Sequence, residues 1–123
     1  DGAFANIVSL IKTETADRTP IPSWFAEILK PGLIMMGKLF KDADVSKVAP
    51  AEYVGDIRFP IAIIHCKEAK RVPFIHGKEI FEKSPEGSVS LFVEDCEHAQ
   101  AYEEDKEIYK KFVFDYLETR LSP

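Results

Sequence analysis

Residues Pro60–Phe74, P-I-A-I-I-H-C-K-E-A-K-R-V-P-F, contain the clearest prediction of secondary structure in the chain. Ile61–Ile64 form a continuous apolar run after a proline, which is typical of a strand buried on both faces of a parallel sheet. A polar loop follows this run. A helix is expected from about Pro73 to Lys83, and it carries the apolar residues Phe74, Ile75, Ile80 and Phe81.

Downstream of this unit, the pattern of strand and helix repeats once. Ser84–Gly87 predict a turn, Val89–Val93 a second strand, and the residues up to Gln100 a polar loop. A last helix is expected over about Tyr102–Arg120, with an acid-rich first turn that suits the helix dipole. The order strand, helix, strand, helix implies parallel strands joined by a right-handed crossover.

Upstream, prolines divide the chain into short helical segments. The apolar spacing predicts an amphipathic helix over residues 3–13 and a polar loop over Thr13–Pro22. An apolar segment follows Pro22 and is expected to end at Pro31-Gly32. Two further features are a second helix over Leu33–Phe40 and a connection over residues 41–59 with at most one short helical turn.

The predicted sheet is incomplete. Two strands cannot bury both faces and both edges of an apolar run such as Ile61–Ile64. The fold class is therefore α/β with missing neighbours, which come from another chain or from the rest of a larger protein. We divide the chain into a helical segment, residues 1–49, and a β-α-β-α unit, residues 50–123.

Composition narrows the classes of function. The 123 residues carry 16 basic and 21 acidic side chains, a net charge of -5, which argues against a nucleic-acid partner. No apolar run approaches the length of a membrane span, so no membrane partner is expected. Two cysteines favour a reducing compartment, taken here as the cytoplasm. No metal-ligand spacing is present, and no cofactor is expected.

The two cysteines, Cys66 and Cys96, follow the two predicted strands. We interpret them as small buried apolar residues at strand ends. A disulfide between them and a reactive pair of Cys with His98 are the alternatives.

The span from Pro50 to Leu121 resembles the C-terminal end of an α/β-hydrolase. In that family a buried strand ends in His-Gly, a catalytic Asp follows, and Val-Pro begins a helix. The next strand leads to a loop with the catalytic His, which the segment S-V-S-L-F-V-E-D-C-E-H-A-Q-A-Y, Ser88–Tyr102, resembles. The opening D-G-A-F-A-N-I resembles the segment after the strand that follows the nucleophile, and residues 13–48 stand where the family often inserts a cap.

The resemblance implies acyl transfer by a Ser-His-Asp triad, with no cofactor. His98 matches the catalytic base. Ala69 stands at the acid position without a carboxylate, and Glu68 beside it is the alternative acid if the loop shifts by one residue. No G-x-S-x-G occurs in the chain, so the nucleophile has to come from elsewhere.

Two functions follow from these observations. The first is the C-terminal portion of a hydrolase of small esters or acyl compounds, whose partner is a missing N-terminal portion. The alternative is a non-catalytic association module derived from that fold, which forms oligomers with a second copy through its open sheet edges.

Overall fold

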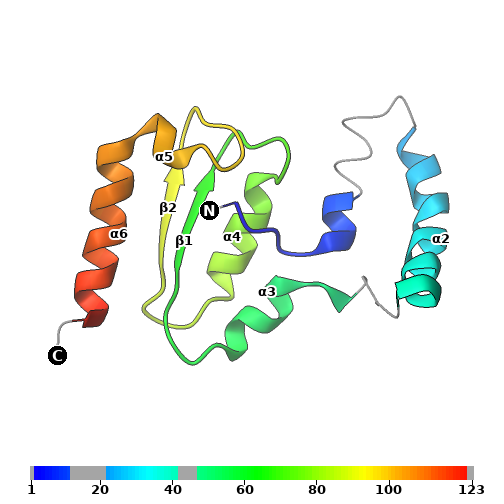
Figure 1. Ribbon diagram of the computed structural model, residues 1–123, viewed down its shortest axis with the longest axis horizontal. Coiled ribbons are helices and arrows are strands. Elements are labelled where there is room, and N and C mark those ends of the chain that lie inside the picture. The colour runs from blue at the N-terminus through cyan, green and yellow to red at the C-terminus, as the bar shows by residue number, and fades with distance from the viewer. Residues whose placement is uncertain (1, 12–21, 42–46, 122–123) are drawn as a thin grey trace.

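The computed structural model of the chain describes residues 2–11, 22–41 and 47–121, and it has an α/β architecture. Strands β1 (Ala62–Cys66) and β2 (Val89–Val93) pair in parallel, with Ile64 opposite Leu91. Helix α4 (Phe74–Glu82) connects them (Figure 1). This strand-helix-strand unit is the one that the sequence predicts, displaced by one or two residues at its ends.

The described sheet has helices on both faces. Helix α4 and the short α3 (Pro50–Tyr53), with its 3-10 continuation η2 (Val54–Asp56), pack beside Ile63 of β1. Helices α5 (Ala101–Glu104) and α6 (Lys106–Leu121) cover the other face, where Ile64 and Cys66 lie. Four of the five residues of β1 are buried, because alternate side chains enter two different clusters.

The N-terminal residues join the core beside β1. The backbone N–H of Gly2 donates to the carbonyl oxygen of Ile64 at 3.1 Å, and the fully buried Ala5 packs with Ala51 and Ile63. Residues 7–11 are helical, within the range 3–13 that the sequence predicts. The helix begins late because the Asn6 side chain accepts a hydrogen bond from the backbone N–H of Val8 at 2.8 Å and so caps it.

The predicted break at Pro31-Gly32 is wrong. Helix α2 runs without interruption over Ser23–Lys41, with Pro31 inside it. Proline removes one backbone hydrogen bond, but the apolar stripe keeps its helical phase across it, from Ile28 to Met35 and Leu39. Residues 13–21 of the predicted loop Thr13–Pro22 lie outside the described residues, as does the middle of the connection, 42–46.

The single last helix that the sequence predicts is two helices. Asp105 has extended backbone, with φ -140° and ψ 90°, between α5 and α6. The carboxylate of Asp105 accepts a hydrogen bond from the backbone N–H of Ile108 at 2.9 Å and so caps the start of α6. An acidic residue therefore lies at the start of the last helix, as expected, but this start falls within the range predicted as one helix. In the part of the chain that is described, no helix is both long and apolar enough to span a bilayer.

Candidate functional site

The loops that follow β1 and β2 lie together at the carboxyl ends of the two strands. The backbone N–H of Lys67 donates to the carbonyl oxygen of Val93 at 2.8 Å, which extends the pairing past the end of β1. Two ion pairs also join the loops, Lys67 with Glu94 and, at 3.6 Å, Lys70 with Glu97. This edge of a parallel sheet is where ligand and catalytic sites of α/β proteins are found.

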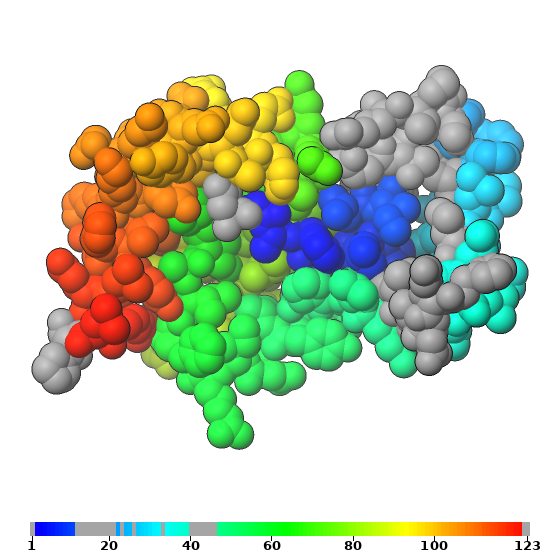
Figure 2. Space-filling view, in the orientation of Figure 1, coloured from blue at the N-terminus to red at the C-terminus, as the bar shows by residue number. Residues whose placement is uncertain are grey.

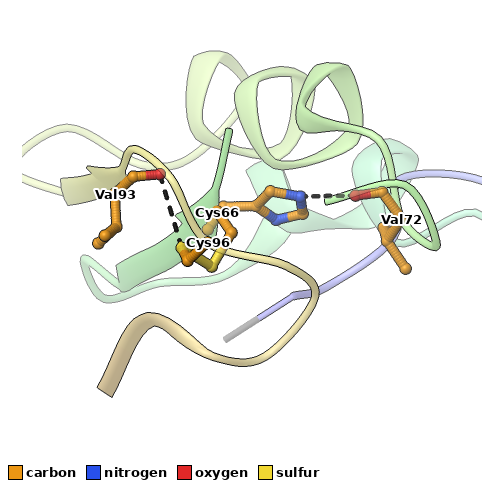
Figure 3. Close-up of a disulfide and its surroundings, with 5 residues drawn as sticks. Cys66, Val72, Val93 and Cys96 are labelled. Carbon is orange, nitrogen blue, oxygen red and sulfur yellow. Dashed lines mark hydrogen bonds between the residues drawn. A yellow bond between two sulfur atoms is a disulfide. The ribbon is translucent and has the colours of Figure 1, made fainter. Parts of the chain in front are cut away.

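A disulfide between Cys66 and Cys96 links the same two loops (Figure 3). The two Cα atoms are 5.3 Å apart, and the residues are 1% and 3% exposed. The expected burial of both cysteines is confirmed, but the interpretation of them as unbonded apolar residues is wrong. The signal was available in part, since both cysteines follow strands whose ends meet at one edge.

His98, the predicted base, lies two residues after the disulfide and is half-buried. Its imidazole packs directly on Gly2: a Cβ atom at residue 2 would lie 2.5 Å from Cε1 and 2.8 Å from Nδ1 of the ring. Figure 2 shows the N-terminal segment, in blue, beside the loop after β2, in yellow. Gly2 has a φ of +71°, so both its backbone and the close approach of the ring favour glycine.

The His98 loop is shaped by two residues with left-handed backbone. Asp95 has a φ of 53° and Ala99 a φ of 63°. Aspartate tolerates this region, whereas alanine adopts it at a cost of the order of 1 kcal/mol. The surrounding contacts therefore have to hold Ala99 in place.

The side of His98 that faces the protein has no hydrogen-bonding partner among the described residues: Nδ1 is buried and unsatisfied. In a Ser-His-acid triad, Nδ1 is the nitrogen that donates to the acid. Ala69, at the position where the resemblance places the acid, is 4% exposed and packs in the apolar cluster of Cys66 and Cys96. Glu68 is exposed, and the described contacts include none between it and His98. Its role as the acid stays a prediction.

The other two histidines form hydrogen bonds with segments next to this edge of the sheet. His65 is fully buried, and its Nε2 donates to the carbonyl oxygen of Val72 at 2.9 Å, which ties the loop after β1 to the strand. Burial lowers the pKa of His65, the hydrogen bond to Val72 opposes this, and the nearby charge of His98 lowers it further. A neutral ring with its proton on Nε2 fits these contacts.

His76 on α4 holds the N-terminal segment. Its Nδ1 accepts the backbone N–H of Ala5 at 3.3 Å, and the residue is 4% exposed. Burial lowers the pKa of His76, Glu79 raises it, and His65 lowers it. No signal in the sequence indicated that His76 positions the segment on which His98 packs. Within the described residues, no group of three or more His, Cys, Asp or Glu could hold a metal ion.

Comparison with known proteins gives one remote similarity. The chain is 26% identical over 98 residues to the uncharacterized protein YqkD of Bacillus subtilis (strain 168), a match that covers 80% of this chain. The match spans 31% of the length of that relative. No family model matches the chain, and no solved structure matches it.

Proposed function

We propose that this chain is the C-terminal portion of an α/β-hydrolase that acts on small esters or acyl compounds, with His98 as the catalytic base. The observation that carries the proposal is the position of His98. It lies at the carboxyl edge of two parallel strands and packs on the N-terminal segment, with Nδ1 directed into the protein. That geometry leaves Nε2 as the nitrogen available to take a proton from a serine.

The proposal assigns the serine to a part of the protein outside this chain. The remote relative is about three times as long as the matched region, which is consistent with a longer protein. The backbone hydrogen bond from Gly2 to Ile64 at the outer edge of β1 supports the same arrangement, because a strand leading into Gly2 would extend the sheet next to β1. A G-x-S-x-G turn on a further strand would then supply the nucleophile and part of the oxyanion hole.

The acid of the triad is the weakest part of this active site. Ala69 brings no carboxylate, and the cost of losing the acid partner in such a triad is of the order of 10⁴ in rate. The proposed enzyme is therefore a slow hydrolase that works with a Ser-His pair, unless Glu68 reaches the ring when the serine-containing portion is present.

An activity-based probe tests this proposal. The chain alone should not react with a fluorophosphonate, whereas the longer protein that contains G-x-S-x-G should be labelled at that serine. His98→Ala should slow the labelling, and Lys111→Gln serves as the control because it alters an exposed charge on α6, outside the proposed machinery. Stoichiometric labelling of the chain alone contradicts the proposal that the serine lies outside it. Labelling of the longer protein at the same rate with and without His98→Ala contradicts the role of His98 as the base.

A non-catalytic association module is the second candidate. The outer edge of β1 receives a backbone hydrogen bond from Gly2, and large apolar side chains of α2 are exposed, among them Trp24, Ile28 and Leu39. Open edges and exposed apolar faces favour pairing with another chain. Light scattering separates the candidates: a stable dimer of the chain at micromolar concentration supports the module, and a folded monomer argues against it.

A further inference from the structure

We propose that the Cys66–Cys96 disulfide is a redox-controlled positioning device for His98. This inference rests on the proposed function only in taking His98 as the active group of this edge. The coupling between the disulfide and the ring is a property of the chain itself, and it can be measured without any substrate.

The disulfide is placed to fix the loop that carries His98. Cys66 is the last residue of β1, and Cys96 is two residues before His98. The bond therefore anchors that loop to the end of a buried strand. Ile64, two residues before Cys66, accepts the hydrogen bond of Gly2, on which the ring packs. The end of β1, through Ile64 and Cys66, thus holds both the loop that carries His98 and the segment against which its imidazole packs.

The remaining connections of the loop are weaker. The ion pairs of Lys67 with Glu94 and Lys70 with Glu97 are between exposed side chains, and pairs of this kind contribute little. The imidazole itself has no described hydrogen bond at Nδ1 that would fix its orientation. In the usual triad the acid has this role, and here Ala69 stands in its place. The disulfide is accordingly the strongest described constraint on where the ring lies.

The chemistry of the switch is thiol-disulfide exchange with a dithiol reductant. One thiolate of the reductant attacks a protein sulfur, the Cys66–Cys96 bond breaks, and a mixed disulfide forms. The second thiol of the reductant displaces the protein sulfur, so the reductant ends as a disulfide and the protein gains two electrons and two protons. Because both cysteines are almost fully buried, the attack requires the loop to open first.

Reduction changes the contacts of Cys96. Its sulfur lies 3.7 Å from the carbonyl oxygen of Val93 (Figure 3), and in the disulfide that sulfur has no proton to donate. After reduction the thiol can donate to this oxygen, while the covalent link to β1 is gone. The loop between the left-handed residues Asp95 and Ala99 is then free to relax, and the ring of His98 moves away from Gly2.

The experiment follows the imidazole signals of the chain by NMR while the disulfide is reduced with dithiothreitol. The signals of His98 are expected to shift and broaden on reduction, and diethyl pyrocarbonate should then modify His98 several-fold faster. The signals of His76 should stay in place, since its contact with Ala5 lies on the other face of β1. Mass spectrometry after alkylation confirms which state is present.

Two variants complete the test. The double variant Cys66→Ser, Cys96→Ser should give the NMR signals of the reduced chain without any reductant. The variant Lys67→Gln removes the exposed ion pair with Glu94 between the same loops and should leave the His98 signals unchanged. The proposal is overturned if the NMR signals of His98 do not change on reduction, or if the signals of His76 and His98 change together because the whole chain unfolds. If the double variant does not fold, the reduction of the unmodified chain with dithiothreitol, followed by NMR, is the deciding experiment. None of these readouts depends on hydrolysis, so failure of the proposed function leaves the result interpretable.

Discussion

Gly2 and His98 are in direct contact near the carboxyl end of β1: a Cβ atom at residue 2 would lie 2.5 Å from Cε1 of the imidazole. Two segments 96 positions apart in the sequence meet here, and neither has a regular secondary structure. Because Gly2 also has a φ of +71°, this position combines a backbone requirement with a steric one.

Replacement of Gly2 by alanine should therefore disturb His98. We expect Gly2→Ala to lower the free energy of unfolding by about 1–3 kcal/mol, because the ring has to move and the backbone is strained. Urea unfolding measures the loss, and the NMR signals of His98 report the displacement. Gly32→Ala is the matched control, since no heavy atom beyond its two neighbours and the backbone of α2 lies within 4 Å of its Cβ position. Equal effects of the two substitutions would contradict the contact.

Gly77 offers a second test of close packing, on the buried side of the sheet. A Cβ atom at residue 77 would lie 2.7 Å from Cγ and Nδ1 of His65. Alanine favours a helix over glycine by about 1 kcal/mol, but the clash should outweigh this gain. Gly77→Ala should be destabilising by about 1–2 kcal/mol in urea unfolding. An increase in stability would show that α4 does not press on His65.

The disulfide should contribute strongly to stability, since it closes a segment with a sequence separation of 30 that contains α4 and β2. Chain entropy alone predicts that Cys66→Ala, Cys96→Ala lowers the free energy of unfolding by about 3.6 kcal/mol. Calorimetry of the oxidised chain and the double variant measures the difference. No change in Tm would mean that the bond is not formed in the folded chain.

Stability should decrease as the pH falls below the ordinary histidine pKa of 6.5. Burial lowers the pKa of both His65 and His76 in the folded chain, so the unfolded chain binds more protons between the lowered values and 6.5. The stabilising effect of the neutral rings is present above 6.5 and is lost through this window. His76→Asn keeps an acceptor for Ala5 without titrating, so it should flatten the pH profile. An unchanged profile would contradict the assignment of His76.

Restoring the acid tests the proposed chemistry. In the proposed longer protein with a serine nucleophile, Ala69→Asp should raise kcat by at least about 10²-fold, part of the roughly 10⁴-fold that a triad acid contributes. Ala69→Asn, similar in size and uncharged, is the control and should not raise it. Glu68→Gln shows whether the neighbouring carboxylate already acts as the acid, in which case kcat falls. Equal rates for Asp and Asn at residue 69 would contradict the assigned acid position.

The sequence predicted the central unit well because its signals are local. The apolar run at Ile61–Ile64 and the Val72-Pro73 helix start are each visible within a few residues, and β1, α4 and β2 confirm them. Pro31 led to a wrong prediction, because a proline inside a helix does not always end it and α2 continues through this residue. Asp105 was assigned to a helix turn, although its cap splits the helix in two.

The candidate site was predicted only in part, because its arrangement depends on contacts between distant residues. His98 was identified by its place after a strand, but nothing near it in the sequence points to Gly2 as the surface on which it packs. The Cys66–Cys96 bond and the contact of His76 with Ala5 likewise join residues 30 and 71 positions apart. Such pairs become visible only when the parallel strands bring their ends together.

The coding DNA immediately upstream of Asp1 shows whether a serine nucleophile is encoded together with His98. We expect the open reading frame to continue upstream into an apolar strand followed by G-x-S-x-G, which supplies this serine. A start codon directly before Asp1 would mean that no nucleophile is encoded with this histidine. That result would contradict the hydrolase assignment and leave the association module as the better explanation of the chain.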